Sequence, residues 1–382
     1  MKNISLLLER VNKQNVDTRG IRNVLKVLKS GFLSKPEGGV YVNLFQEKFS
    51  KLLEKKFSFA TNSGTSSLHA AVSSLELKKD DEVLVPALTF MADASVVIQV
   101  GAKPVFVDIS EDDFNLDPQD VLKKITPHTK ALIVVHLYGQ PAKMDKLIKI
   151  VEENNLVLIE DCAQAVGAKY KGKFVGSFGD ISCFSFYQTK NLVCGEGGMI
   201  VTNSNLYAKK LRSILNNGIK HPNVDRYDFN HIGFNYQMTE IQAALGIRQL
   251  ERLERLNQIR RKYAKIYKEI LADTDIIFQK EADETYNVYY YLTGILPKNL
   301  RRKRNMFIKK LLLQQIPVRC LYPLSLPETQ ICRDMGIADP NLTPVAKDIS
   351  KRIFNLYVHP GFRENEIIGF AKSIRKIYKS LI

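Results

Sequence analysis

The strongest constraint in this sequence is a regular alternation of short apolar runs with segments of helical periodicity, which begins near residue 60. The apolar runs are continuous and rich in β-branched residues. Such runs are typical of strands that are covered on both faces, as in a largely parallel sheet. The predicted strands are residues 83–85, 105–107, 131–135, 156–159, 181–186 and 199–201. The pattern leaves the direction of the last strand open.

The segments between these runs carry helix signals. Residues 117–125, for example, begin with an acidic cap that is followed by Pro118 in the favoured first turn. The three predicted helices are residues 66–77, 117–125 and 143–154. Strands that alternate with helices predict an α/β domain with a mostly parallel central sheet between helices.

The alternation of apolar runs and helical segments ends after a long predicted helix at residues 238–271. We therefore predict a large domain over residues 1–250 and a smaller C-terminal α/β domain over residues 251–382. The large domain begins with an arm and a helix, and the small domain contains one strand and two helices. These elements are the helix at 20–28, the strand at 286–296 and the helices at 305–315 and 364–381.

The net charge of +16 raises the question of a nucleic-acid, membrane or anionic small-molecule partner. The excess is concentrated in residues 251–382, which hold 25 Lys and Arg against 14 Asp and Glu, with the densest run at residues 301–304. That run lacks a helix-turn-helix signature and interleaved aromatic residues, and like-charge runs are usually solvated. We therefore expect no nucleic-acid partner.

Other classes are excluded by what the sequence lacks. No apolar run approaches the roughly 18 residues of a membrane-spanning helix, so we expect no membrane partner. The five cysteines are scattered and never in C-x-x-C spacing, which is typical of a reducing cytoplasm. The six histidines form no pair at metal-ligand helix spacing, so we expect no metal.

Three constellations follow predicted strands, where ligands bind in open α/β sheets. The hydroxyl-rich turn at residues 62–68 opens a helix and suits a phosphate, although a plain capping turn has the same composition. Glu160 and Asp161 follow four apolar residues, where an unpaired carboxylate is costly, so Asp161 needs a cationic partner unless it only caps the next segment. Lys190 lies between a buried strand and a glycine-rich turn at 195–198, and is a candidate Schiff-base amine, although loop lysines are usually solvated.

Each constellation alone favours the plain structural interpretation, but together they indicate one cofactor. A phosphate cradle, a carboxylate for a protonated pyridine nitrogen and a lysine for an aldehyde are the three anchors of pyridoxal 5′-phosphate. The sequence therefore predicts a pyridoxal-phosphate enzyme.

The sequence also resembles the DegT/StrS-type sugar aminotransferases, which are pyridoxal-phosphate enzymes of fold type I. The likeness runs from about residue 20 to residue 270, and more weakly to the end. Seven motifs occur in family order, and this makes chance similarity very improbable. They are residues 62–65, 86–90, 101–108, 136–139, 160–165 and 185–190, and 233–236 running into 242–245.

The resemblance implies a role for each matched position. Lys190 corresponds to the lysine that forms the Schiff base and then moves protons, Asp161 to the carboxylate beside the pyridinium nitrogen, and Gln164 to a glutamine beside the ring. Phe90 corresponds to an aromatic residue stacked on the cofactor. Phosphate-binding positions correspond to Gly64, Thr65, Ser66 and Ser185, and to Asn235, which in the family reaches the phosphate of the partner subunit. The last match implies a homodimer with shared active sites.

The resemblance further implies that glutamate or glutamine donates an amino group to the keto group of a nucleotide-linked deoxy sugar. Relatives with histidine at position 190 are dehydratases, and the lysine here favours transamination. A keto-inositol or another keto-sugar without a nucleotide is the alternative substrate. A cofactor- or DNA-binding regulator without turnover is a remote alternative.

The sequence departs from the family mainly at the substrate end. Gln237 replaces a frequent arginine, and residues 321–324 lack a frequent histidine. The basic surplus can attract the pyrophosphate of a sugar nucleotide. Candidate substrate contacts are Lys220, Arg226, Arg319 and Tyr322.

Overall fold

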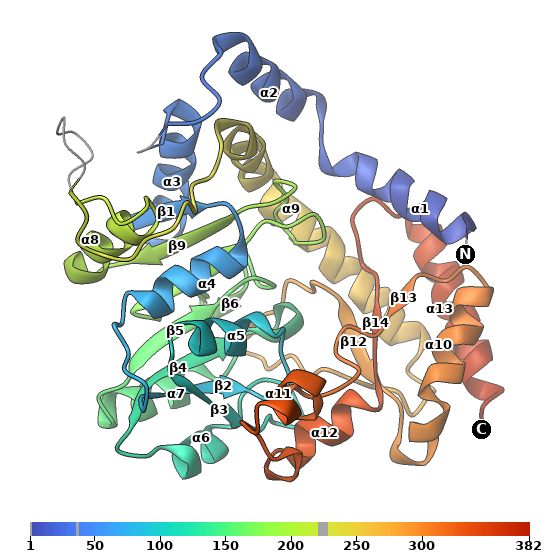
Figure 1. Cartoon of the computed structure of the whole chain (residues 1–382). Coiled ribbons are helices and arrows are strands. Elements are labelled where there is room, and N and C mark those ends of the chain that lie inside the picture. Colours follow the sequence, from blue (N-terminus) through green and yellow to red (C-terminus); the bar gives the residue numbers. More distant parts are fainter. Residues whose placement is uncertain (1, 36–37, 221–227) are drawn as a thin grey trace.

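The computed structural model of the chain describes residues 2–35, 38–220 and 228–382. Its centre is a seven-stranded sheet with helices on both faces (Figure 1), in the order β1-β9-β8-β5-β4-β2-β3. The strands are β1 (Phe57–Thr61), β2 (Glu82–Pro86), β3 (Lys103–Val107), β4 (Thr129–Val135), β5 (Val157–Asp161), β8 (Ile181–Ser185) and β9 (Gly198–Thr202). The pairs from β8 to β3 are parallel, whereas β9 is antiparallel to both of its neighbours.

Both faces of this sheet are buried, which is why its strands read as continuous apolar runs. On one face Val83 and Val85 pack with α4, α5 and α8. On the other face Leu84 packs with α6 and α7, and Phe184 packs with α3 and α9. These helices are α3 (Val40–Leu53), α4 (Gly64–Ser73), α5 (Ala92–Gln99), α6 (Pro118–Lys124), α7 (Met144–Glu153), α8 (Asn205–Ile214) and α9 (Glu240–Ile270).

A second core lies in the C-terminal third. A four-stranded sheet, β10-β12-β14-β13, packs with α10 and α13. A small sheet, β11-β6-β7, joins the two parts of the chain. The elements are β6 (Lys169–Tyr170), β7 (Lys173–Phe174), β10 (Ile277–Phe278), β11 (Thr285–Tyr286), β12 (Leu292–Ile295), β13 (Val318–Arg319), β14 (Ile353–Leu356), α10 (Arg304–Leu313), α11 (Gln330–Asp334), α12 (Pro344–Ser350) and α13 (Glu364–Lys379).

The segment between β13 and β14 returns to the large sheet. Leu326 donates its N–H to the Ala87 carbonyl at 2.8 Å, directly after β2. Asp108, just after β3, accepts the N–H groups of Val345 and Ala346 at the start of α12. The C-terminal third therefore covers the edge of the sheet at which β2 ends.

The N-terminal residues form two helices, α1 (Lys2–Asn12) and α2 (Thr18–Ser30). Figure 1 shows α1 beside α13, and Arg10 pairs there with Glu366 at 2.7 Å. The helix α9 runs through residue 250 without a break, so the chain itself does not mark the domain boundary there, and that boundary remains a prediction. In the described part of the chain, no helix combines the length and the apolar character that crossing a bilayer requires.

All six predicted strands of the large sheet are present, and the last of them is antiparallel. Two predictions were wrong. The predicted N-terminal arm is the helix α1. The predicted strand at 286–296 is divided into β11 and β12, because the N–H groups of Val288 and Tyr290 bond to the carbonyls of Gly139 and Tyr138 instead of continuing a ladder.

Glu240, the first residue of α9, caps the start of α3. Its carboxylate accepts the backbone N–H groups of Gly39, Tyr41 and Val42 at 3.0, 2.8 and 3.0 Å, and its side chain is buried. The Cβ of any residue in place of Gly39 would lie 2.6 Å from the Glu240 carboxyl carbon. One carboxylate therefore joins the two helices that pack under β8 and β9.

We expect Glu240→Ala to lower the free energy of unfolding by about 2–4 kcal/mol, because it leaves three N–H groups at a buried helix start without an acceptor. Urea unfolding of the apoprotein measures this change. The matched control is Glu269→Ala, which removes an exposed partner of Lys265 on the same helix and is expected to cost less than about 0.5 kcal/mol. Equal losses in the two variants would contradict the capping role.

Candidate active site

The predicted site residues come from one edge of the central sheet. Asp161 and Ser185 end the parallel strands β5 and β8. Thr61 ends β1, from which the chain enters α4, and residues 87–90 follow β2. Strand ends at one edge bring together residues that are far apart in the sequence.

Glu160 fixes the end of β5. Its buried carboxylate accepts the N–H groups of Gly176 at 2.7 Å and Phe178 at 2.9 Å, and the Ser182 hydroxyl at 3.1 Å. It also accepts a bond from His136 Nε2 at 3.0 Å, since His136 Nδ1 accepts the Ala142 N–H and Nε2 therefore carries the hydrogen. Burial opposes ionisation, but these bonds outweigh it and lower the pKa of Glu160.

Asp161, the next residue, points to the other face of the sheet edge and meets a second carboxyl group. Its side chain is 6% exposed, and its Oδ1 accepts the Ala163 N–H at 2.8 Å. Burial raises the pKa of Asp161, while the Ala163 bond and the nearby Lys190 charge oppose that rise. The second carboxyl belongs to Asp93 in the first turn of α5, which is fully buried.

Lys190 lies in the loop after β8. Its Nζ is 4.8 Å from the centre of the Tyr290 ring, and its N–H bonds to the Tyr187 carbonyl at 2.9 Å. The Tyr290 hydroxyl is 2.7 Å from the Thr189 hydroxyl. The segment between β11 and β12 therefore forms one wall around the amine.

Gln164 connects three parts of the site. Its Oε1 accepts the N–H of Tyr138 at 2.9 Å, and its Nε2 donates to the Tyr322 hydroxyl at 2.8 Å. Tyr138 has a positive φ of 58° and is fully buried, and its ring lies 5.7 Å from that of Tyr322. Tyr322, a predicted substrate contact, is thus held beside a predicted cofactor contact.

The start of α4 lies against the end of β8. A Cβ at Gly64 would be 2.6 Å from the Cβ of Ser185, so only glycine allows this approach. Ser63 caps the helix by accepting the Ser66 N–H at 3.1 Å, while the N–H groups of Gly64 and Thr65 have no partner within the helix. Two N–H groups that the helix leaves without a partner, together with the Ser185 hydroxyl, suit a phosphate at this helix N-terminus.

For the remaining predicted residues, the structure shows no hydrogen bond or ring contact with Lys190 or Asp161 within its described part. Phe90 is 60% exposed beside the site, just after Thr89. Asn235 is exposed, and its carbonyl accepts a bond from the Asn62 amide at 3.2 Å. Lys220 is exposed and pairs with Asp228 at 3.0 Å. Arg319 is exposed, with its guanidinium 5.7 Å from the Tyr357 ring centre, and Arg226 lies outside the described residues.

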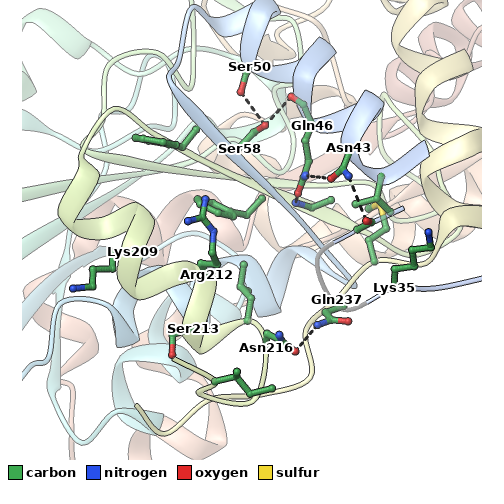
Figure 2. Close-up of a pocket in the computed structure, with 18 of the residues that line it drawn as sticks. Lys35, Asn43, Gln46, Ser50, Ser58, Lys209, Arg212, Ser213, Asn216 and Gln237 are labelled. Carbon is green, nitrogen blue, oxygen red and sulfur yellow. Dashed lines mark hydrogen bonds between the residues drawn. The ribbon is translucent and has the colours of Figure 1, made fainter. Parts of the chain in front are cut away.

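A large cavity of about 840 Å³ lies elsewhere, between α3, β1 and α8 (Figure 2). Its basic lining residues are Lys35, Lys56, Lys209, Arg212 and Lys220. Gln237, which replaces the arginine frequent in the family, also lines it and donates to Asn216 at 2.7 Å. None of the residues around Lys190 and Asp161 lines this cavity.

Part of the densest basic run, residues 301–304, takes part in contacts within the fold. Arg304 is buried, and its Nη1 donates to the carbonyls of Ser350 at 3.4 Å and Ile353 at 3.3 Å and contacts the Cys320 sulfur. Arg301 pairs with Asp348 at 3.4 Å. The run is therefore not a continuous solvated basic face.

Sequence reasoning missed Asp93, Tyr290 and Tyr138 as parts of the site. Asp93 is an acidic residue inside the apolar run 92–98, and that contrast is a signal for a buried polar function. The two tyrosines carried no such signal. A carboxylate, a lysine and a phosphate-accepting helix start at one sheet edge fit the anchors of pyridoxal phosphate.

Comparison with known proteins gives matches over almost the whole chain. The profile of the DegT/DnrJ/EryC1/StrS aminotransferase family matches residues 14–375. GDP-perosamine synthase of Vibrio cholerae is 33% identical over 354 residues, which cover 93% of this chain and 95% of that protein. UDP-N-acetyl-3-dehydro-α-D-glucosamine 3-aminotransferase of Acidithiobacillus ferrooxidans is 35% identical over 315 residues, 82% of each chain.

The fold agrees with these matches. The PLP-form structure of Spr1654 from Streptococcus pneumoniae superposes with a TM-score of 0.90 at 26% identity, over 96% of this chain and 97% of that one. A PMP form of the same protein superposes equally well. The predicted fold type I architecture is therefore confirmed.

We expect Glu160→Gln to lower the free energy of unfolding by about 2–4 kcal/mol at pH 7, because its amide N–H₂ would face the N–H groups that now donate to Oε2. The pKa of Glu160 is lowered below its ordinary value of 4.5. The stabilisation by the ionised Glu160 carboxylate is therefore fully present above pH 4.5 and is lost as the pH falls through the lowered pKa of the folded state. Urea unfolding at pH 7 and pH 4 should show the gap between wild type and variant narrowing in acid.

The matched control for this comparison is Glu153→Gln, whose side chain is exposed at the end of α7. It should leave the free energy of unfolding almost unchanged at both pH values. A Glu160→Gln protein as stable as wild type at pH 7 would contradict the structural role of the carboxylate.

Proposed function

We propose that this chain transfers an amino group to the keto group of a nucleotide-linked sugar. The premise is that the chain belongs to the DegT/DnrJ/EryC1/StrS aminotransferase family. The protein is an aminotransferase, and its cofactor is pyridoxal 5′-phosphate. The observation that carries the proposal is the grouping of Lys190, Asp161 and the start of α4 at one edge of the sheet.

Each cofactor contact has a proposed role that follows from its chemistry. When bound, pyridoxal phosphate accepts the amino group and serves as an electron sink for the carbon that loses a proton. Asp161, as a buried carboxylate, would hold the protonated ring nitrogen. Gln164 would approach the ring from the side of Tyr322, and Phe90 would stack on its face. The phosphate would be held by Gly64, Thr65, Ser66 and Ser185.

Lys190 would bind the cofactor and then move the proton of the reacting carbon. Its amine lies near two carboxyl groups and beside the Tyr290 ring, inside a wall closed by the Thr189 to Tyr290 hydrogen bond. A positioned amine is both an acceptor and a donor of protons, so one group can serve both halves of a proton shift.

The substrates are proposed as glutamate or glutamine for the donor and a keto-sugar nucleotide for the acceptor. Support comes from relatives whose names specify a GDP-sugar and a UDP-sugar. Tyr322 beside Gln164, and the exposed Arg319, are the proposed contacts for the acceptor. Lys220 and Arg226 complete the proposed set. Activity on a keto-inositol, with none on a panel of keto-sugar nucleotides, would replace this substrate by the alternative.

The cysteines support a cytoplasmic location. All five are free, and four of them are buried. Thiols in this state are typical of reducing compartments. Sugar nucleotides as substrates would be consistent with that location.

We expect Lys190→Ala to lower turnover at least about a thousandfold, since it removes the proton-transferring amine and the cofactor attachment. The measurements are coupled transaminase turnover, and the cofactor absorption band that glutamate bleaches in the wild type. The matched control is Lys298→Ala, an exposed lysine far along the chain, which should retain both. Full turnover in the Lys190→Ala protein would refute the assignment.

The second proposal is a homodimer in which Asn235 of each subunit completes the site of its partner. Large apolar side chains are exposed close in sequence to residues that line the 840 Å³ cavity, among them Phe32, Val40, Phe229 and Ile232, with Ile232 88% exposed. Exposed apolar groups of this kind mark interaction surfaces. A second copy of the chain is the proposed occupant, because Phe90 at the site is also left uncovered.

We expect mixed dimers of Lys190→Ala and Asn235→Ala subunits to be active although each parent is nearly inactive. If Asn235 acts in the partner's site, each mixed dimer contains one site with both Lys190 and Asn235 intact. Unfolding and refolding the two proteins together, followed by turnover measurement, provides the test. Co-refolded protein no more active than the parents would show that Asn235 acts within its own subunit or not at all.

A further inference from the structure

Two carboxyl groups are buried together at the cofactor edge of the sheet. Asp93 is 0% exposed and Asp161 is 6% exposed. The Thr89 hydroxyl donates to Asp93 Oδ2 at 2.7 Å, and the Ala163 N–H donates to Asp161 Oδ1 at 2.8 Å. Asp93 Oδ1 has no hydrogen-bond donor within the described part of the chain. A buried carboxylate oxygen without a donor is costly, so this atom requires an explanation.

A proton on Asp93 removes this cost. Two ionised carboxylates cannot donate to each other and repel strongly at low dielectric, whereas a protonated carboxyl can donate to its ionised neighbour. Burial raises the pKa of Asp93 well above its ordinary value, and the charge of Asp161 adds to the rise. For Asp161, the Ala163 N–H, the Lys190 charge and the side chain of Asp93 all oppose the effect of burial. The shared proton therefore resides on Asp93.

The surrounding titratable groups favour the same arrangement. Lys190 faces the pair from the loop after β8. His136, after β4, lies near Asp161, but its ring bonds to Glu160 and to the Ala142 N–H. Cys183 on β8 and Tyr322 after β13 also face it, and burial raises the pKa of both, so that they stay neutral. One negative charge, on Asp161, is thus left opposite the Lys190 cation.

We propose that Asp93 is a positioning residue, which carries a proton at neutral pH and donates a hydrogen bond that keeps Asp161 ionised and fixed in orientation for the ring nitrogen of the cofactor. This inference rests on the cofactor role of Asp161 proposed above. A carboxylic acid kept neutral by its surroundings is a strong hydrogen-bond donor at pH 7. Asp93 acts only through Asp161.

Two variants of similar size separate the donor from the charge. Asp93→Asn keeps an N–H donor and cannot ionise, whereas Asp93→Leu removes the donor. We expect the Leu variant to bind pyridoxal phosphate at least about tenfold more weakly, as for loss of one hydrogen bond to a charged group. Its bound-cofactor absorption should also titrate at a shifted pH. The Asn variant should match wild type in both measurements.

Weakened binding by both variants would overturn the proposal, because an ionised Asp93 would then be the active form. Unchanged binding and titration in Asp93→Leu would also overturn it. Asp161→Asn separates the two levels of inference. If that variant binds the cofactor normally, the role of Asp161 itself fails, and if it binds weakly while Asp93→Leu does not, only the role of Asp93 fails.

Thermal melting of the apoprotein gives a readout without cofactor and covers the case in which Asp93→Leu does not fold. The pKa of Asp93 is raised, so the stabilisation from its neutral form is present at low pH and is lost as the pH rises. The melting temperature of Asp93→Asn should therefore gain on wild type between pH 6 and pH 9, and a constant gap would contradict a protonated Asp93. Asp113→Asn, a buried aspartate paired with Lys143 outside the site, is the matched control for cofactor binding.

Discussion

The site depends on the buried carboxylate of Glu160. It is a single acceptor for donors from the end of β4, from the turn before β8 and from β8 itself. These segments are joined in the sheet only through β5, and their loops would otherwise leave that edge independently. Because Glu160 is held by so many bonds, the backbone of Asp161 is fixed before any ligand binds. Glu160 thus has a structural role, and the adjacent Asp161 is left to contact the cofactor.

The same division recurs around the edge of the sheet. Gln164 uses one end of its amide to hold the strained backbone of Tyr138 and the other to hold Tyr322. Gly64 allows α4 to approach Ser185 because a side chain would not fit. In each case a residue with a local steric or hydrogen-bonding task places a second residue toward the ligand. Preorganisation of this kind lowers the reorganisation that the reaction requires.

Patterns in the sequence were sufficient for six of the seven strands of the central sheet and for the residues that follow them, but they did not predict β1. Strands buried on both faces are continuous apolar runs. Asp161 and Lys190 could be predicted because they are charged residues that closely follow such runs. The pattern failed where long-range contacts decide the structure. Residues 287–291 have strand-like alternation, yet they bond to the Tyr138 turn, which lies about 150 residues earlier. The role of Asp93 in α5 was not predicted because its partner, Asp161, lies on β5, far along the sequence. The assignment of roles within the site came from the family resemblance, because a role depends on the bound cofactor and not on the local pattern.

The return of the C-terminal segment to the large sheet also sets an order of events during synthesis. Tyr322 and the Leu326 bond to Ala87 come from a segment whose position is fixed by β14, since Asn355 accepts the Leu321 N–H at 2.9 Å. All seven strands of the large sheet precede residue 203 in the chain. The strands of the cofactor edge are therefore translated before α9, which covers one face of the sheet, and the wall beside the site stays open until the residues beyond 356 have been translated. The cofactor can therefore be bound in its final geometry only after most of the chain has been translated.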